Sequence, residues 1–419
     1  MTAMMLESYA AGQWIGPGPD ARAIASAVTG EEVAVAGSAL DYQAMLDHAR
    51  FTGGPNLRAM TFHDRARMLK ALAMYLGERK AKLYELSLHA GCTKADAWID
   101  VDGGIGTLFV FASKGRRELP DAHVYVDGGI EQLSKGGTFL GQHILTPLQG
   151  AAIHINAFNF PVWGMLEKLA PTLLAGVPAI VKPATATSYV AEACFRMMIE
   201  SGILPEGAVQ FIAGGTGDLL DRLTTQDVVS FTGSAATALM LRSKPHILEN
   251  SIRFIAEQDS LNASVLGPDA TPDTPEFELF VKEVVREMTA KAGQKCTAIR
   301  RILVPKAVES DIIEALKAKL AKTVIGDPGA EGVRMGPLAS LAQRQDVMEK
   351  VAVIGQEAEC VYGDPKSFAV EGADAEKGAF VPPMLFRCAD PAGASRIHET
   401  EAFGPVSTVM AYDTLDEAV

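Results

Sequence analysis

The chain has 419 residues, 48% of them hydrophobic, so it can bury the cores of two or more domains. Its formal net charge of −13 argues against a non-specific nucleic-acid or anionic-membrane surface, while leaving room for a local basic pocket. The chain contains no secretory-type start, no long apolar run and no CxxC pair, and its five cysteines are scattered. We therefore predict a soluble cytoplasmic protein with reduced thiols and no metal site.

Residues 1–121 are expected to be mostly helical, because leucines and methionines recur at helical spacing from 62 to 90 and Gly91 follows as a stop. Residues 122–148 instead carry β-forming residues on both sides of Asp127-Gly128-Gly129. This pattern predicts a hairpin or β-ribbon that turns at those glycines. Such a ribbon could bridge subunits, and an ordinary surface hairpin is the alternative.

From residue 151 onward, short apolar runs alternate with helical segments. The runs cover residues 151–158, 177–184, 208–214, 228–233 and 253–258. Uninterrupted apolar runs are typical of strands buried on both faces, which indicates an α/β fold with a doubly wound parallel sheet. Ligands of such sheets bind at the carboxyl ends of the strands, so the residues that follow each run are candidates for a site.

Two glycine pairs, at 104–106 and 215–217, approach the dinucleotide signature G-x-G-x-x-G but lack its final glycine. The turn at Gly233 and Ser234 is a better candidate, because a buried strand ends there and a helix begins at once. Gly233 would let a phosphate approach the backbone, and Ser234 could cap the helix. A plain strand-to-helix turn is the alternative.

The strand end near Lys182 favours NADP over NAD as the cofactor. Enzymes that select NAD often place a carboxylate at the end of the second strand of the dinucleotide-binding fold. Here that strand is followed by residues 184–188, which contain no acidic residue. Thr185, Thr187 and Ser188 can donate hydrogen bonds to phosphate oxygens, and Lys182 adds positive charge. Hydroxyls also tolerate a ribose, so we expect a preference rather than the exclusion of NAD.

Cys296 lies in the sequence KAGQKCTAIRR, residues 291–301. A thiol is a nucleophile only as its thiolate, and Lys291, Lys295, Arg300 and Arg301 could supply the positive charge that favours this form. The alternative is that Cys296 is a small buried apolar residue.

Six motifs, in this order, resemble those of the aldehyde dehydrogenase superfamily: FNFP at 158–161, VKPA at 181–184, FTGS at 231–234, Glu257, GQKC at 293–296 and EAFGPV at 401–406. The resemblance covers essentially the whole chain. It implies the aldehyde dehydrogenase fold, with a doubly wound dinucleotide-binding domain, an α/β catalytic domain and a β-ribbon bridging arm. We expect residues 1–121 and 149–258 to form the dinucleotide-binding domain, 122–148 the bridging ribbon, and 259–419 the catalytic domain.

The resemblance also implies a role for each site residue. Cys296 would form a thiohemiacetal from which hydride leaves to a nicotinamide, and Glu257 would activate the water that hydrolyses the thioester. The side-chain amide of Asn159 and the backbone N–H of Cys296 would stabilise the oxyanion. The implied cofactor-binding residues are Lys182, Thr185, Gly233, Ser234, Glu401 and Phe403. On the residues alone, Asn159 could instead cap a helix, and Glu257 and Glu401 could be ordinary surface carboxylates.

Within the superfamily, segments such as 100–109 and 291–301 most resemble the dehydrogenase half of the bifunctional phenylacetate-degradation enzyme. This implies NADP-dependent oxidation of 3-oxo-5,6-dehydrosuberyl-CoA semialdehyde by a homo-oligomer, with 3,4-dehydroadipyl-CoA semialdehyde of the benzoyl-CoA pathway as the alternative substrate. Alternatives from other classes are a cysteine hydrolase and a non-catalytic dinucleotide-binding scaffold.

Two departures and the chain end bear on this resemblance. Residues 258–262 replace a Gly-Gly-Lys run that many relatives carry, and Ala238 replaces a glycine of the FTGS turn. The phenylacetate-degradation group also diverges at residues 258–262, so that departure supports the resemblance to it, whereas Ala238 could change how closely the helix after the FTGS turn packs. Thr414 and Glu417 have capping-box spacing, so a helix is expected to begin at the end of the chain. We therefore expect a catalytic domain that is incomplete at its C-terminus, and a longer full-length protein.

Overall fold

The computed structural model describes residues 3–37 and 39–419, which form two compact units. Unit 1 comprises Met1–Ile24, Ala34–Leu83 and Trp98–Gln258, and unit 2 comprises Ala25–Val33, Tyr84–Ala97 and Asp259–Val419. Among the described residues, no helix is both long and apolar enough to cross a bilayer.

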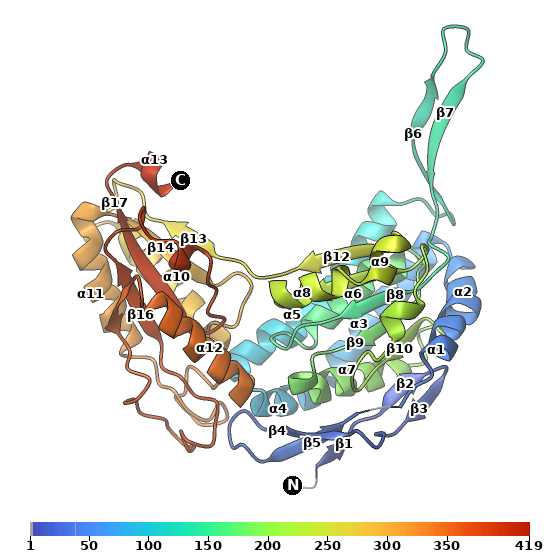
Figure 1. Ribbon diagram of the computed structural model, residues 1–419. Coiled ribbons are helices and arrows are strands. Elements are labelled where there is room, and N and C mark those ends of the chain that lie inside the picture. Colours follow the sequence, from blue (N-terminus) through green and yellow to red (C-terminus); the bar gives the residue numbers. More distant parts are fainter. Residues whose placement is uncertain (1–2, 38) are drawn as a thin grey trace. The chain divides into compact units, whose positions relative to one another are not determined.

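Unit 1 is built on a seven-stranded sheet (Figure 1). The strands, in spatial order, are β12 (Arg253–Glu257), β11 (Val228–Thr232), β8 (Ala152–Ile155), β9 (Ala179–Lys182), β10 (Val209–Phe211), β2 (Ser8–Ala10) and β3 (Gln13–Ile15). The first five run parallel, while β2 and β3 are antiparallel additions at one edge. The five parallel strands correspond to the five predicted apolar runs, so that prediction is confirmed.

Helices cover both faces of this sheet. The crossover helices α6 (Trp163–Leu174) and α7 (Ser188–Glu200) pack with α3 (Phe62–Arg79), which begins with a capping box at Thr61. Residues of α1 (Tyr42–His48), α8 (Ala235–Arg242) and α9 (Pro245–Glu249) join the sheet in another apolar core. From β8 the chain adds β9 and β10 on one side and later β11 and β12 on the other. The strand order therefore reverses between β8 and β11, where such sheets bind ligands.

The N-terminal segment is less helical than predicted. The short strands β1 (Met4–Met5), β2, β3, β4 (Arg22–Ala25) and β5 (Glu32–Ala36) precede α1. Strands of two to five residues show too little alternation to be recognised from sequence, and β2 exists because Tyr9 pairs with Phe211 of β10, far along the chain. Further on, α2 (Gly54–Arg58), α4 (Ala81–His89) and α5 (Lys94–Glu118) are helical as expected.

The predicted ribbon consists of β6 (Tyr125–Gln132) and β7 (Leu140–Leu145), and it extends from the body of unit 1 (Figure 1). Its turn lies at residues 134–138 rather than at the predicted glycines. Asp127-Gly128-Gly129 lies inside β6, where the pairing shifts between Asp127 and Glu131. Gly128 has φ +73°, so the glycines form a bulge in the strand instead of reversing it.

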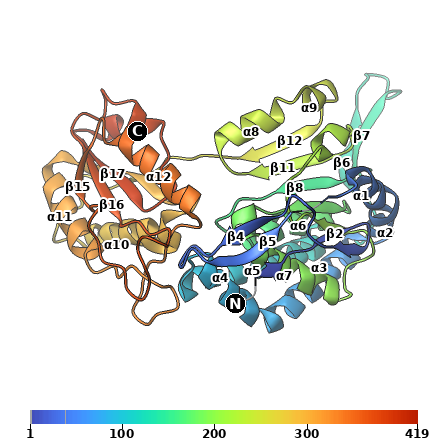
Figure 2. The same ribbon diagram turned by 60° about the horizontal axis from the view of Figure 1, so that its bottom comes forward.

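Unit 2 contains a five-stranded sheet (Figure 2). Its strands, in spatial order, are β13 (Asn262–Val265), β14 (Ile299–Pro305), β17 (Val406–Tyr412), β16 (Met384–Cys388) and the antiparallel β15 (Glu359–Tyr362). Helices α10 (Pro275–Thr289) and α11 (Glu309–Leu320) form one core with it, and α12 (Leu341–Ile354) forms another. Adjacent residues of β16 separate the two cores, because Leu385 belongs to the first while Met384 and Phe386 belong to the second.

The sequence placed residues 25–33 and 84–97 in the dinucleotide-binding domain. In the structure these two segments belong to unit 2. The amide of Ala27 donates to the carbonyl of His89, and the amide of Ala379 donates to the carbonyl of Ala27. At the C-terminal end of the chain, α13 (Leu415–Ala418) is capped by Thr414, whose hydroxyl accepts from the amide of Glu417. This confirms the predicted helix start.

The glycine pair at 104–106 is helical and does not form a phosphate loop. It lies within α5, and a Cβ added at Gly104 would be 2.8 Å from the Cα of Trp163 on α6. The carboxylate of Asp100, also on α5, accepts from the amides of Val162 and Trp163. The segment therefore fixes the start of α6.

Candidate active site

The predicted site residues fall into two groups, one in each unit. In unit 1 the strand pairing aligns Phe231 with Ile155, Ile155 with Lys182, and Thr232 with Glu257. The carboxyl ends of β12, β11, β8 and β9 are therefore neighbours at one edge of the sheet. Glu257, the Gly233 turn, the Asn159 loop and Lys182 follow these strand ends, as the sequence predicted.

Asn159 is buried, with 8% of its surface exposed, in the loop between β8 and α6. One alternative gave its side chain to the cap of the following helix. The structure gives that cap to Asp100, whose carboxylate lies 2.8 Å from the amide of Trp163. The Asp100 carboxylate thus serves as a cap at the start of α6.

Glu257 is exposed at the end of β12. The hydroxyl of Thr232 donates to its Oε2 at 3.5 Å, and the ammonium of Lys168 donates to the same hydroxyl at 2.7 Å. Burial lowers the pKa of Lys168, and the nearby carboxylates of Glu167 and Glu257 partly offset this. Burial has the opposite effect on the neighbouring acid and raises the pKa of Glu167. Glu257 is thus the exposed end of a short chain of polar groups that sequence reasoning did not identify.

The Gly233-Ser234 turn has the predicted form. The hydroxyl of Ser234 caps α8 by accepting from the amide of Thr237 at 3.3 Å. A Cβ added at Gly233 would lie 2.7 Å from the ring of Phe231, so this backbone position accepts only a glycine without rearrangement. Ala238, one turn later, is fully buried in the core, so its methyl group packs inward.

The strand end that suggested NADP has fewer available donors than predicted. Thr187 and Ser188 are buried, and their hydroxyls donate to the carbonyls of Phe158 and Thr185. Thr185 is the exposed hydroxyl residue of the three. Burial lowers the pKa of Lys182. Two of the three hydroxyls that the sequence offered as phosphate donors therefore donate to backbone carbonyls instead.

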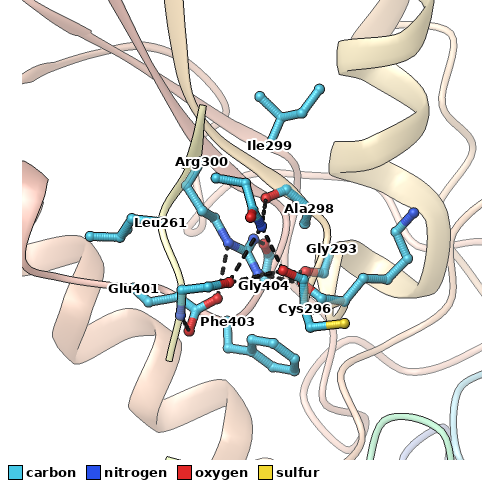
Figure 3. Close-up of polar contacts among 12 residues, drawn as sticks. Leu261, Gly293, Cys296, Ala298, Ile299, Arg300, Glu401, Phe403 and Gly404 are labelled. Carbon is cyan, nitrogen blue, oxygen red and sulfur yellow. Dashed lines mark hydrogen bonds and ion pairs between the residues drawn. The ribbon is translucent and has the colours of Figure 1, made fainter. Parts of the chain in front are cut away.

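In unit 2, Cys296 is exposed on the loop between α10 and β14 (Figure 3). Its carbonyl accepts from the hydroxyl of Ser260 at 2.9 Å and from the side-chain amide of Asn262 at 2.5 Å. Both residues belong to the segment 258–262, which departs from the common Gly-Gly-Lys run. Sequence reasoning noted the departure but did not assign this function to it.

Three of the other four cysteines are poorer nucleophile candidates. Burial raises the pKa of Cys194, Cys360 and Cys388, which disfavours their thiolates. The thiol of Cys360 also donates to the carbonyl of Tyr362. Cys296 is exposed on a loop, so the alternative that it is a small buried residue is wrong.

The basic residues around Cys296 have specific partners. The ammonium of Lys291 lies 2.9 Å from the sulfur of Cys92, and that of Lys295 lies 2.7 Å from the carboxylate of Glu287. Arg301 donates to the carbonyl of Leu261. Of the four cations proposed to assist the thiolate, these three are thus engaged elsewhere. Arg300 has Cys296 among its electrostatic neighbours.

Gly293 brings the GQKC and EAFGPV motifs into backbone contact. It has φ +69°, and a Cβ there would lie 2.2 Å from the carbonyl oxygen of Gly404. The side chain of Gln294 donates to the carbonyl of Lys291 and accepts from the amide of Ala339, both at 2.9 Å. These contacts define the path of the loop immediately before Cys296.

Glu401 is buried, and burial raises its pKa while the positive charge of Arg300 lowers it. One carboxylate oxygen lies 3.5 Å from the Nε of Arg300, and the other accepts from the amide of Ser260 at 3.2 Å. Glu401 is therefore not an ordinary loop carboxylate. Phe403 lies beside this pair, with its ring centroid 5.5 Å from the guanidinium carbon of Arg300.

The residues present fit a nicotinamide dinucleotide. Asn156, 4% exposed at the carboxyl end of β8, has no hydrogen-bond partner for either side-chain polar atom within residues 3–37 and 39–419. The N-terminus of α8 follows a turn without a Cβ at Gly233, as a bound phosphate requires. In unit 2, Glu401 supplies an acceptor suited to ribose hydroxyls.

Comparison with known proteins shows the class. The chain belongs to the aldehyde dehydrogenase family, whose family model matches residues 19–419. It is 46% identical to the 3,4-dehydroadipyl-CoA semialdehyde dehydrogenase of Aromatoleum evansii over 418 residues, covering 99% of this chain and 81% of that relative. It is 30% identical to a putative aldehyde dehydrogenase of Staphylococcus aureus over 273 residues, covering 63% of this chain and 54% of the relative.

Solved structures confirm the predicted fold. The betaine aldehyde dehydrogenase of Staphylococcus aureus, crystallised with NAD+, matches with a TM-score of 0.84 at 23% identity, covering 99% of this chain and 79% of that one. A putative aldehyde dehydrogenase from Burkholderia cenocepacia matches with a TM-score of 0.85 at 22% identity, covering 99% and 82%.

Proposed function

We propose that this protein oxidises the aldehyde group of an acyl-CoA semialdehyde to a carboxylate, with 3,4-dehydroadipyl-CoA semialdehyde or a close analogue as substrate. The observation that carries the proposal is the 46% identity, over 99% of this chain, to an enzyme with that name. This favours the alternative substrate over 3-oxo-5,6-dehydrosuberyl-CoA semialdehyde, which the sequence motifs had favoured.

The chemistry begins at Cys296. Its sulfur attacks the aldehyde carbon, and the resulting oxyanion accepts hydrogen bonds from the side-chain amide of Asn159 and the backbone N–H of Cys296. A bound nicotinamide dinucleotide supplies the acceptor for the departing hydride. The exposed position of Cys296, together with the hydrogen bonds that fix its carbonyl, supports this role.

Glu257 completes the reaction. It takes a proton from the water that attacks the thioester carbon, and the Cys296 sulfur leaves as the carboxylic acid forms. The exposure of Glu257 and its contact with the Thr232 hydroxyl support this assignment, because both allow water to reach a hydrogen-bonded carboxylate.

The cofactor binds, in this proposal, through Lys182, Thr185, Gly233 and Ser234 within residues 1–121 and 149–258, and through Glu401 and Phe403 within residues 259–419. The exposure of Thr185 and the absence of an acid in residues 184–188 support a preference for NADP. The ribbon at 122–148 would join subunits, since it exposes several apolar side chains.

The test follows reduced nicotinamide by its near-ultraviolet absorbance, with both CoA semialdehydes and a free aliphatic aldehyde as substrates. We expect the highest kcat/KM with 3,4-dehydroadipyl-CoA semialdehyde. We expect Cys296→Ala to lower turnover by at least about a thousandfold while cofactor binding persists, because the variant lacks the nucleophile.

Cys360→Ala is the matched control, since Cys360 is also exposed and free but belongs to the distant edge strand β15. Near-normal turnover by Cys296→Ala would contradict the proposal. So would steady ester cleavage without any reduced nicotinamide from an aldehyde, which is the behaviour of a cysteine hydrolase.

A further inference from the structure

We propose that Arg300 is a positioning residue that joins the loop of Cys296 to the loop of Glu401 and keeps the Glu401 carboxylate ionised for the cofactor. The inference rests on the proposed function, in which Glu401 binds the nicotinamide ribose. It gives Arg300 a role toward Glu401, whereas the sequence suggested only that this cation could assist the thiolate of Cys296.

The guanidinium group contacts both loops at once (Figure 3). One terminal nitrogen of Arg300 donates to the carbonyl of Gly404 at 2.7 Å, three residues after Glu401. The other donates to the carbonyl of Gly293 at 2.9 Å, three residues before Cys296. The Nε atom lies 3.5 Å from a carboxylate oxygen of Glu401. A single side chain therefore hydrogen-bonds to the backbone of both loops and forms an ion pair with the Glu401 carboxylate.

The two loops are also too close to move independently. A Cβ at Gly293 would lie 2.2 Å from the carbonyl oxygen of Gly404, so the backbones are in direct contact. The hydroxyl and amide of Ser260 add a second connection, because they donate to Cys296 and Glu401 respectively. Of these connecting groups, Arg300 supplies the positive charge.

The positive charge of Arg300 stabilises the negative charge of Glu401 because both side chains are buried. Arg300 and Glu401 are only 5% and 7% exposed, and a buried charge needs a partner of opposite sign. Burial raises the pKa of Glu401, and Asp259 acts in the same direction. Arg300, the Ser260 amide and Lys350 oppose that rise. The titratable groups next to Arg300 are the carboxylates of Glu401 and Glu287 and the thiol of Cys296.

The consequence is a defined pH dependence. Without Arg300 the pKa of Glu401 rises, so the carboxylate is protonated over a wider range above its ordinary value. A protonated carboxyl group loses acceptor capacity toward ribose hydroxyls. Function that depends on Glu401 is then lost at lower pH and returns as the pH is raised.

The experiment measures the rate constant for the first turnover of cofactor reduction from about pH 6 to pH 9, by rapid mixing with a saturating aldehyde. The proteins are wild type, Arg300→Met, Glu401→Gln and the double variant. Arg387→Met is the matched control, because Arg387 forms a bidentate pair with Glu309 in the same unit but outside the site.

We expect Arg300→Met to be slowed about tenfold or more at the acid end, for a pKa rise of about one unit or more, and to recover toward alkaline pH. Glu401→Gln should be slow at every pH. The double variant should match Glu401→Gln, because Arg300 acts through that carboxylate. Arg387→Met should keep the wild-type profile.

A wild-type pH profile for Arg300→Met, or a double variant slowed by the product of the two single effects, would overturn the inference. If Arg300→Met does not fold, Arg300→Lys decides. This variant keeps the charge but not the forked contacts, so it should show a lower rate constant with the wild-type midpoint, and an unchanged rate constant would overturn the inference. Absence of cofactor reduction in the wild type would instead refute the proposed function.

Discussion

Thr185 shows how the choice of cofactor can depend on one side chain. Thr187 and Ser188 are buried and hydrogen-bonded to nearby carbonyls, which leaves Thr185 as the exposed hydroxyl at this strand end. A carboxylate there would repel a 2′-phosphate and accept from ribose hydroxyls.

We predict that the wild type prefers NADP and that Thr185→Glu shifts the kcat/KM ratio toward NAD by about tenfold or more, in proportion to a repulsion of about 1.4 kcal/mol. Thr271→Glu, exposed between β13 and α10 in unit 2, is the control for added charge. A wild-type preference for NAD, or an unchanged ratio in Thr185→Glu, would show that this strand end does not select the cofactor.

At the level of elements, the loop before Cys296 is defined by the close contact of two glycine-containing motifs. Gly293 combines φ +69° with direct contact to Gly404. Gly332 has a similar φ of +87° but nothing within 4 Å of the position a Cβ would take. Both glycines would be strained by a side chain because of their positive φ, but only at Gly293 would a Cβ also collide with another loop.

We predict that Gly293→Ala and Gly332→Ala each lose about 1–2 kcal/mol of stability from the positive φ. Only Gly293→Ala should also lower turnover, by about tenfold or more, because its new Cβ displaces the loop that carries Cys296. Urea unfolding and steady-state kinetics on both variants check this. Equal turnover in the two variants would mean that the contact between the loops does not position the thiol.

The sequence predicted those elements whose hydrophobic pattern lies within a short run of consecutive residues. The five parallel strands and the helices α6, α7 and α8 are correct, because a buried strand or an amphipathic helix leaves its pattern in consecutive residues. The strands β1 to β5 were missed because they are short and gain stability from distant partners, such as Phe211 opposite Tyr9. The ribbon turn was misplaced because a glycine with positive φ can form a bulge as well as a reversal.

In the candidate site, too, the sequence predicted what depends on local pattern and missed what depends on contacts between distant segments. Motifs and strand ends identified Cys296, Glu257 and Asn159 as candidates. The partners that hold this region come from distant segments, as Ser260 does for the carbonyl of Cys296. Nearby charge was a poor guide, because Lys295 is paired with Glu287. Spacing along the chain does not indicate which of several adjacent cations points at a thiol.

At the scale of the whole molecule, the ribbon is the feature suited to self-association. It exposes apolar side chains on both strands, including Ile130 at 64% and Ile144 at 55% exposure. Exposed apolar groups gathered on one projecting element are typical of an interface. A closed oligomer would bury them against another copy of the chain.

We predict that the double variant Ile130→Lys/Ile144→Lys sediments as a smaller species than the wild type, because burying two charged groups opposes association. Met74→Lys is the control, since Met74 is 52% exposed on α3, away from the ribbon. Sedimentation velocity distinguishes these outcomes, and an unchanged mass for the ribbon variant would show that the arm does not join subunits.

We propose that this chain carries a cysteine nucleophile and a separate carboxylate base for aldehyde oxidation. The most direct measurement is the first turnover of Glu257→Gln with the CoA semialdehyde and NADP, followed by mass spectrometry of the protein. We predict a burst of about one reduced cofactor per chain, then a stall with the acyl group attached to Cys296, because hydrolysis is the step that needs the base. Continued turnover at the wild-type rate, or an acyl group on any residue other than Cys296, would rule out this division of roles between Cys296 and Glu257.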